Sequence, residues 1–196
     1  MTKLISIMGP IGVGKTTLAE HLAEELGAEL VLEDFAGNPY LADSCRGRND
    51  LILPSQVYFL MTRARQLARE HWDSREGLAV SDYAFCQDEL YARLKLVPQE
   101  LAIYRALLEP TMGLVTRPRV LIHLDAPLEV LCDRIAGRGR EFESWYTEEF
   151  LAAHRQAHWD YQPPAGVKLL RVNTAESDLR EDSTREKLGR MIRAVL

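Results

Sequence analysis

A glycine-rich segment near the N-terminus has the residue types and the spacing of a loop that binds phosphate groups. Residues 9–16 read GPIGVGKT, which fits the pattern GxxxxGK[ST], and they lie between an apolar stretch and an amphipathic one. Glycines let successive backbone N–H groups point inward, and the start of the following helix adds partial positive charge. We expect Lys15 to reach the β- and γ-phosphates of a nucleoside triphosphate and the Thr16 hydroxyl to bind Mg²⁺. The residues predicted to hold ATP are Gly9, Pro10, Ile11, Gly12, Val13, Gly14, Lys15, Thr16 and Thr17.

Three arginines lie close together in the second half of the chain. Arg134 and Arg138 are one helical turn apart on the same face of a predicted helix, and Arg140 follows Gly139. Guanidinium groups this close repel one another unless an anion or carboxylates meet them, and cations stabilise the charge on a transferring phosphoryl group. A solvated basic helix end is the alternative interpretation. Beside a phosphate loop, we expect these arginines to meet the phosphate groups of a bound nucleotide.

Three polar residues could serve the group that accepts the phosphoryl group. Glu33 ends a predicted strand beside the phosphate loop, where a carboxylate can orient an attacking hydroxyl and take its proton. Gln56 and Arg63 are seven residues apart, two turns along one face of a predicted helix. A glutamine both donates and accepts hydrogen bonds, which suits the edge of a nucleobase, and an arginine adds donors or supports a carboxylate. Taken alone, Glu33 is also compatible with an ordinary exposed residue at the end of a strand. Gln56 and Arg63 are also compatible with two polar residues on a solvated helix face.

Alternating strands and helices must position these residues. Strands are predicted at 3–8, 28–33, 77–82, 119–125 and 167–173, and helices at 16–26, 54–72, 86–113, 126–137, 147–161 and 179–195. This alternation predicts an α/β fold of three layers, with a five-stranded parallel sheet flanked by helices on both faces. Ligands of such sheets bind beyond the carboxyl ends of the strands, where the phosphate loop, Glu33 and Asp82 are expected to meet.

Composition limits the classes of protein that the chain can belong to. Its 196 residues favour a single domain at 1–196, and its net charge of −5 argues against nucleic acid or an anionic membrane as the main partner. Cys45, Cys86 and Cys132 are scattered without CxxC spacing, as expected for reduced thiols in the cytoplasm. No apolar run is long enough for a membrane span or a signal peptide. The sequence also lacks the NKxD motif of regulatory GTPases, which favours a compact kinase acting on a small molecule.

The motifs together resemble the deoxyribonucleoside kinases, particularly bacterial deoxyadenosine and deoxyguanosine kinases. The matching stretches are GPIGVGKTT, LEDFAGNPYL, QVYFLMTRARQL and HLDAPLEVLCDRIAGRGREFE, and they extend from residue 4 to about residue 145. The RxxxRGRxxE spacing in the last stretch is the most specific. The resemblance implies a P-loop kinase fold with an arginine-rich lid at about residues 136–146, and it implies a homodimer. It also implies that ATP, with Mg²⁺, phosphorylates the 5′-hydroxyl of a deoxyribonucleoside, with purines preferred.

The resemblance also assigns roles to individual residues. It implies that Glu33 is the base for the 5′-hydroxyl and that Glu143 holds the sugar 3′-hydroxyl. It implies that the nucleobase is contacted by Gln56, Arg63 and Asp88. It also implies that the arginines of the lid are Arg134, Arg138 and Arg140.

Two positions depart from the family pattern. An acid-Arg-Ser triplet is expected after the third strand, and here it reads Asp82-Tyr83-Ala84, which keeps an acid that can hold a magnesium-bound water but lacks the arginine. Cys45 occupies the position, eleven residues before Gln56, where a sugar-binding tyrosine is expected. Phosphate chemistry is therefore better supported than sugar recognition.

Two other functions stay open at this point. A nucleoside monophosphate kinase of the thymidylate type would need further cations to grip the phosphate of its acceptor. A non-catalytic module that binds nucleoside triphosphates would bind ATP without acceptor-dependent release of ADP. His154 and His158 are four residues apart on a predicted helix, but without a third ligand at a suitable spacing they are interpreted as packing residues.

Overall fold

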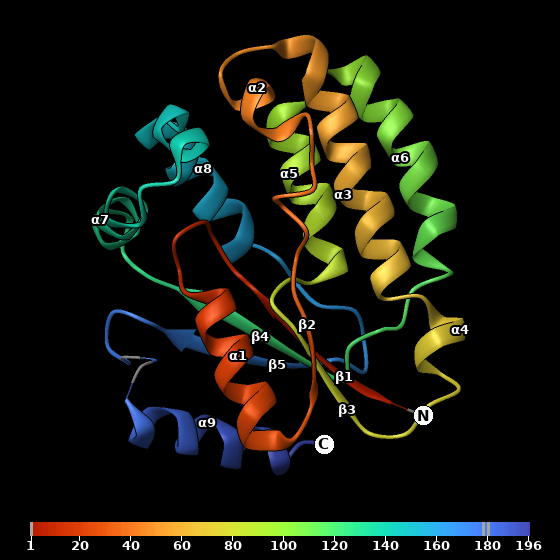
Figure 1. Ribbon diagram of the computed structural model, residues 1–196, viewed down its shortest axis with the longest axis vertical. Coiled ribbons are helices and arrows are strands. Elements are labelled where there is room, and N and C mark those ends of the chain that lie inside the picture. Colours follow the sequence, from red (N-terminus) through yellow and green to blue (C-terminus); the bar gives the residue numbers. More distant parts are fainter. Residues whose placement is uncertain (1, 178, 180) are drawn as a thin grey trace.

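Five parallel strands form the centre of the computed structural model, which describes residues 2–177, 179 and 181–196 (Figure 1). The strands are β1 (Lys3–Met8), β2 (Glu29–Val31), β3 (Leu78–Ser81), β4 (Val120–Asp125) and β5 (Lys168–Asn173). Their order in the sheet is β2-β3-β1-β4-β5, and every neighbouring pair is parallel. The predicted α/β fold is confirmed.

Helices cover both faces of the sheet because successive strand residues point to opposite sides. In β1, Ile5 and Ile7 pack into one buried cluster, whereas Leu4 belongs to a second cluster. The first cluster includes residues of α1 (Lys15–Leu26), α7 (Leu128–Arg138) and α9 (Asp182–Arg193). The second lies under α3 (Ile52–Gln66), α5 (Asp88–Lys95) and α6 (Pro98–Met112), and α8 (Glu148–Trp159) packs against α5. The result is the three-layer arrangement visible in Figure 1.

Two long helices predicted from the sequence are each divided, so these predictions were wrong. The helix expected at 54–72 is α3 followed by α4 (Arg69–Trp72), because Ala68 is extended and forms a bridge with Val115. The helix expected at 86–113 is a 3₁₀ turn (Phe85–Gln87) followed by α5 and α6. Pro98 begins α6, and the residue before a proline is driven out of the helical conformation, as Val97 is here with ψ at 158°.

The second strand is shorter than predicted. It ends at Val31, although the sequence suggested 28–33, because the backbone N–H of Glu33 donates to the Asp82 side chain instead of a strand partner. Short elements complete the chain: α2 (Leu41–Cys45) and the 3₁₀ turns Asn49–Leu51 and Glu141–Trp145. The last predicted helix, at 179–195, is observed as α9, and residue 180 lies outside the described residues.

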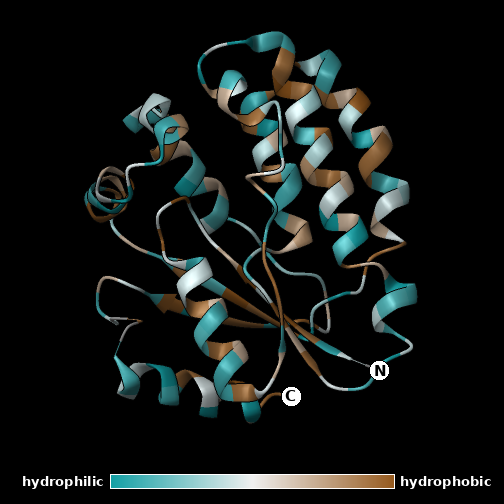
Figure 2. Ribbon diagram, viewed as in Figure 1, coloured by the Kyte–Doolittle hydropathy of each residue, from teal (hydrophilic) through white to brown (hydrophobic). Residues whose placement is uncertain are grey.

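Apolar residues follow the sheet and the inner helix faces, and polar residues cover most of the outside (Figure 2). The outward side of α6 is an exception, with Ile103 54% exposed and Met112 51% exposed. Among the described residues, no helix combines the length and the apolar character that crossing a membrane requires.

Candidate active site

The phosphate loop joins β1 to α1 and depends on its glycines. Gly9 and Gly12 have φ values of +146° and +82°, a region that L-residues avoid. A Cβ at Gly9 would lie 2.4 Å from the Leu124 carbonyl oxygen, and one at Gly12 would lie 2.9 Å from Ile135 Cγ1. The loop is therefore packed directly against β4 and α7, and a side chain at either position would displace it.

Lys15 lies inside this loop. Its Nζ donates to the carbonyl oxygens of Gly9 and Pro10 at 2.9 and 3.0 Å. Burial lowers the pKa of Lys15 to about 8. Phosphate oxygens offer a buried ammonium stronger acceptors than backbone carbonyls do, so this geometry suits a nucleoside triphosphate.

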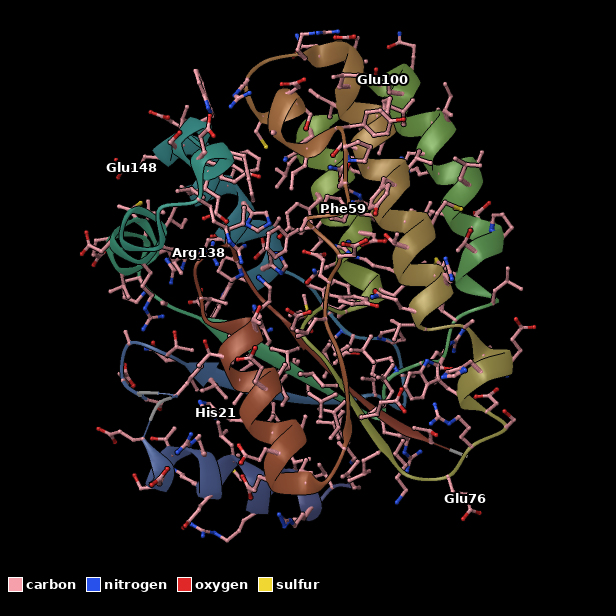
Figure 3. All side chains as sticks on the ribbon, viewed as in Figure 1. His21, Phe59, Glu76, Glu100, Arg138 and Glu148 are labelled. Atoms are coloured by element: carbon pink, nitrogen blue, oxygen red, sulfur yellow. The ribbon has the colours of Figure 1, made fainter. Side chains whose placement is uncertain are left out.

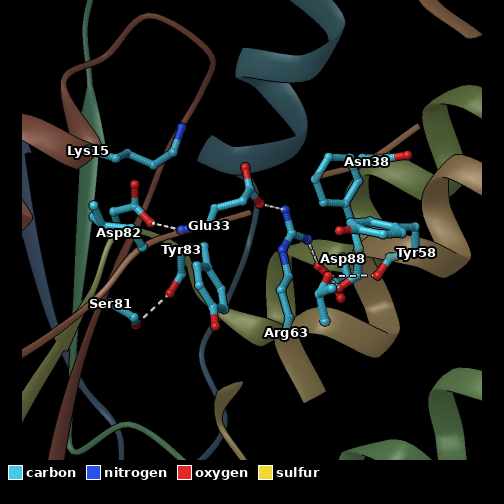
Figure 4. A network of polar contacts seen from close by, with 12 residues as sticks. Lys15, Glu33, Asn38, Tyr58, Arg63, Ser81, Asp82, Tyr83 and Asp88 are labelled. Atoms are coloured by element: carbon cyan, nitrogen blue, oxygen red, sulfur yellow. Dashed lines mark hydrogen bonds and ion pairs between the residues drawn. The ribbon is translucent and has the colours of Figure 1, made fainter. Parts of the chain in front are cut away.

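Asp82 connects the ends of three elements. It accepts a hydrogen bond from the Thr16 hydroxyl at 2.7 Å and another from the Glu33 backbone N–H at 2.8 Å (Figure 4). Burial raises the pKa of Asp82. This carboxylate fixes the start of α1 and the segment that carries Glu33. Thr16 and Glu33 are therefore held in fixed positions relative to each other.

Arg63 joins the Glu33 carboxylate to α5. It forms ion pairs with both Glu33 and Asp88 (Figure 4), and the Arg63 and Asp88 side chains are only 6% and 1% exposed. Figure 4 also shows the Glu33 carboxylate and the Lys15 ammonium reaching into the same space. The sequence placed Arg63 near a base or a carboxylate, and the structure brings it to two carboxylates.

Tyr83 stands where the family resemblance led us to expect an arginine. Its ring lies 5.4 Å from the Arg63 guanidinium carbon, and its hydroxyl donates to Gln66 Oε1 at 2.8 Å. Gln66 in turn donates to the Leu32 carbonyl at 2.9 Å, next to Glu33 in the chain. Tyr83 thus supports Arg63 and the backbone beside Glu33, and it brings no charge of its own.

The end of α7 forms the predicted arginine-rich segment. Arg138 contacts Glu143 through two hydrogen bonds of 3.0 and 2.6 Å, and Arg140 lies 3.6 Å from the same carboxylate. Arg140 also stacks over the Phe35 ring at 4.0 Å. Figure 3 shows Arg138 and Phe59 on opposite sides of the space above α1.

Arg134 separates from the other two arginines. It donates to the Thr174 hydroxyl at 2.8 Å and to the Thr174 carbonyl at 2.9 Å, and it reaches the Val13 carbonyl at 3.4 Å. It lies in a second hollow, shared with Arg138 and residues of the phosphate loop. Arg134 therefore holds the outer side of the loop, whereas Arg138 and Arg140 face Glu143.

A cavity of about 150 Å³ connects these groups. Residues 11–17 of the phosphate loop line it, and the other predicted residues that line it are Glu33, Gln56, Arg63, Asp82, Arg138, Arg140 and Glu143. Asp88 reaches it only through Arg63. The sequence reading missed the aromatic wall, formed by Phe35, Phe59, Tyr91, Phe142 and Tyr146, and it missed Lys95. A helical spacing gives a signal for two of these residues, since Tyr91 and Lys95 follow Asp88 by three and seven positions on one face.

Tyr146 approaches the position where the sequence has Cys45. Cys45 Sγ lies 3.3 Å from the Tyr146 hydroxyl, so a tyrosine from the segment after α7 comes to the place where one was expected at Cys45 itself. Tyr146 stacks on Phe150 with ring centroids 5.0 Å apart. Phe150 thus supports Tyr146, which is the member of the aromatic wall at this end of the cavity.

His154 and His158 pack as expected. Both are fully buried, their rings lie 4.7 Å apart, and Tyr91 covers them from α5. Burial lowers the pKa of each imidazole. In the part of the chain that the structure describes, no group of three histidine, cysteine or acidic residues has the geometry to hold a metal ion.

Comparison with known proteins adds an independent line of evidence. The family model for deoxynucleoside kinases matches residues 5–195. A deoxyguanosine kinase from Bacillus subtilis is 30% identical over 177 residues, which are 89% of this chain and 82% of the relative. A deoxyadenosine kinase from Dictyostelium discoideum is 28% identical over 197 residues, 97% of this chain and 78% of that relative. The solved structure of a deoxyadenosine kinase from M. mycoides, with products dCMP and dCDP bound, has a TM-score of 0.83 at 20% identity and covers 98% of this chain and 100% of its own.

Proposed function

The chain belongs to the deoxynucleoside kinase family, and on that premise we propose that it transfers the γ-phosphoryl group of ATP to the 5′-hydroxyl of a purine deoxyribonucleoside. One observation supports this most directly. The Glu33 carboxylate and the Lys15 ammonium line the same cavity, so a hydroxyl held by one is presented to a phosphate held by the other. This arrangement is what in-line phosphoryl transfer needs.

Glu33 orients the acceptor in this proposal. As the bond between O5′ and the γ-phosphorus forms and the bond to the β-phosphate oxygen breaks, the proton of the hydroxyl passes to the Glu33 carboxylate. Arg63 pairs with Glu33 and fixes the position of the carboxylate that receives this proton. Gln56 faces the nucleobase, and Glu143 receives the sugar 3′-hydroxyl.

The cations serve the transferring group. Lys15 holds the β- and γ-phosphates, and Arg138 and Arg140 stabilise the charge that spreads over the phosphoryl oxygens. Glu143 holds both arginines over the cavity, so closure of residues about 136–146 excludes water that would otherwise accept the phosphoryl group. Arg134 keeps the outer side of the phosphate loop in place.

The residues present fit a magnesium ion. Thr16 and Asp82 place two oxygen atoms 2.7 Å apart beside the phosphate loop, and Mg²⁺ prefers one or two such oxygens together with waters and substrate phosphates. When bound, the ion neutralises charge on the β- and γ-phosphate oxygens. Thr16 and Asp82 are therefore proposed as its protein-side partners.

A coupled assay of ADP release tests the proposal. The four deoxyribonucleosides and their monophosphates are offered separately with ATP and Mg²⁺, and we expect turnover with deoxyadenosine or deoxyguanosine and none with the monophosphates. Turnover with a monophosphate alone would establish the competing kinase class. Binding of ATP without any acceptor-dependent release of ADP would establish the non-catalytic module.

The proposal includes a homodimer that acts in the cytoplasm. Apolar side chains remain exposed on the outer faces of α3 and α6, namely Met61 at 44%, Ile103 at 54% and Leu107 at 38%. Apolar area of this kind is typical of a subunit interface. Light scattering is expected to give twice the chain mass, and Ile103→Asp to give a monomer. A wild-type monomer at micromolar concentration would contradict the dimer.

The three cysteines are free, which supports the proposed location in the cytoplasm.

A further inference from the structure

Tyr146 brings its side chain to the end of the cavity where α2 meets the segment after α7. We propose that the Tyr146 hydroxyl donates a hydrogen bond to the 3′-hydroxyl of the acceptor sugar, so that Tyr146 and Glu143 bind this group together. The inference rests on the proposed function, because it concerns how the acceptor of that reaction is recognised. It adds a donor to the single carboxylate that the proposed function assigns to the sugar.

Contacts from two helices hold the Tyr146 ring in place. The ring stacks on Phe150 of α8 with centroids 5.0 Å apart, and the ammonium of Lys95 on α5 lies 5.1 Å from the Tyr146 centroid. Both contacts are attractive, because stacked rings and a cation over a ring face each gain energy from the charge distribution of the ring. The phenol therefore has a defined direction before any ligand binds.

The Tyr146 hydroxyl has a proton to donate. The Cys45 thiol donates to its oxygen across 3.3 Å, and none of the residues that the structure describes accepts a hydrogen bond from it. Burial raises the pKa of Tyr146, and the charge of Glu143 adds to this effect, so the phenol stays protonated at neutral pH. A ligand atom that accepts a hydrogen bond would satisfy this donor.

Glu143 supplies the matching acceptor from the same turn. The backbone N–H of Tyr146 donates to the Glu143 carbonyl at 3.1 Å and closes the 3₁₀ turn Glu141–Trp145. Residues three apart in a 3₁₀ turn project to the same side. Arg138 and Arg140 already contact the Glu143 carboxylate, but a carboxylate has about four acceptor sites, which leaves capacity for a ligand hydroxyl.

An alcohol is the group that suits a donor and an acceptor placed together, because its oxygen accepts one hydrogen bond while its proton makes another. A deoxyribonucleoside has two sugar hydroxyls, at C5′ and C3′. In the proposed reaction Glu33 receives the 5′-hydroxyl and Gln56 faces the nucleobase. The 3′-hydroxyl is therefore the group left for Tyr146 and Glu143, which line the same cavity.

Two pairs of nucleosides and the variant Tyr146→Phe test the inference. 2′-Deoxyadenosine and 2′-deoxyguanosine carry the 3′-hydroxyl, and their 2′,3′-dideoxy analogues lack it. Tyr146→Phe keeps the ring that stacks on Phe150 and removes only the phenol oxygen. Isothermal titration calorimetry, by competition where binding is weak, gives the dissociation constants of all four nucleosides.

We expect the wild-type protein to bind each deoxyribonucleoside more tightly than its dideoxy analogue. Tyr146→Phe is expected to raise the dissociation constants of the deoxyribonucleosides by about 3- to 10-fold, the range for a lost hydrogen bond between neutral groups, and those of the dideoxy analogues by less than about twofold. A purely structural role of Tyr146 would weaken both members of a pair equally, so the ratio within each pair isolates the contact with the hydroxyl.

Tyr161→Phe is the matched control. Tyr161 also lies beside a cysteine, Cys86, but these two residues line a separate cavity next to α6, and the variant should leave all four dissociation constants unchanged. Cys45→Ala removes the thiol and leaves the phenol. It is expected to keep the preference for the 3′-hydroxyl, because the thiol donates to Tyr146 and not to the ligand.

Three results would overturn the inference. The first is equal binding of both members of each pair by the wild-type protein. The second is a Tyr146→Phe variant that keeps the full wild-type preference for the 3′-hydroxyl. The third is a preference lost in Cys45→Ala alone, which would assign the contact to the thiol. Failure of the proposed function looks different, because the wild-type protein would then release no ADP with either deoxyribonucleoside.

Discussion

His123 provides a stability test whose sign follows from its burial. It lies in β4, is 2% exposed and packs against the rings of His158 and Trp159. Its Nε2 is buried, and none of the residues that the structure describes forms a hydrogen bond with it. Burial, reinforced by the Arg171 charge, lowers the pKa of His123 from 6.5 to about 4. Between these values the unfolded chain binds a proton that the folded protein excludes, so this histidine makes the unfolding free energy rise with pH.

The size of the effect follows from the shift. At about pH 5 the unfolded-state pKa is 1.5 units above the solution pH, and each unit corresponds to about 1.36 kcal/mol, so excluding the proton costs the folded state about 2 kcal/mol. Well above pH 6.5 this cost disappears. His123→Leu removes the titrating imidazole and replaces it with an apolar side chain of similar size.

Urea unfolding of the wild type and His123→Leu at about pH 7.5 and about pH 5 measures this difference. Relative to the wild type, the variant is expected to gain about 2 kcal/mol of unfolding free energy on going to the lower pH. His154 is present in both proteins, but the His123 charge contributes to the lowered pKa of His158, whose ring it contacts, so the comparison is repeated in a His158→Leu background. If the difference in unfolding free energy between the two proteins is the same at both pH values, His123 does not exclude a proton from the folded state.

Two variants test the groups around the transferring phosphate and Glu33. Arg138→Ala is expected to lower kcat by about 100-fold or more with a much smaller change in ATP affinity, because the arginine acts on charge that develops during transfer. A kcat within tenfold of wild type in the coupled assay would remove Arg138 from that role. Tyr83→Phe leaves Gln66 Oε1 without its donor and is expected to lower the unfolding free energy by about 1 kcal/mol, as measured by urea unfolding. Unchanged stability would show that the phenol contributes nothing to the support of Arg63.

Local patterns were sufficient to predict the phosphate loop and the strands. The glycines at 9 and 12, with Lys15 and Thr16 at fixed spacing, define the loop because each position has a steric or chemical requirement that the sequence alone expresses. Pro98 also indicates in the sequence that a helix ends by Val97, and the prediction of one helix at 86–113 did not take this proline into account.

Contacts between distant segments could not be predicted in the same way. The sequence predicted the helix face on which Arg63 lies. Its ion pairs with Glu33 and Asp88, however, depend on how closely α5 approaches α3. Arg134 and Arg138 share a helix face, yet Arg134 lies one turn nearer the phosphate loop and reaches Thr174 instead of Glu143. Such choices between partners depend on packing, which local spacing does not determine.

In the proposed reaction the Glu33 carboxylate takes the proton of the acceptor hydroxyl, and Glu33→Gln is the sharpest test of this claim. The amide keeps the size of the side chain but cannot act as a base at neutral pH. Turnover of the preferred deoxyribonucleoside at saturating ATP is expected to fall by about 100- to 10,000-fold, the usual contribution of general base catalysis, while the dissociation constant for ATP stays within about twofold. An unchanged kcat in Glu33→Gln would contradict the claim.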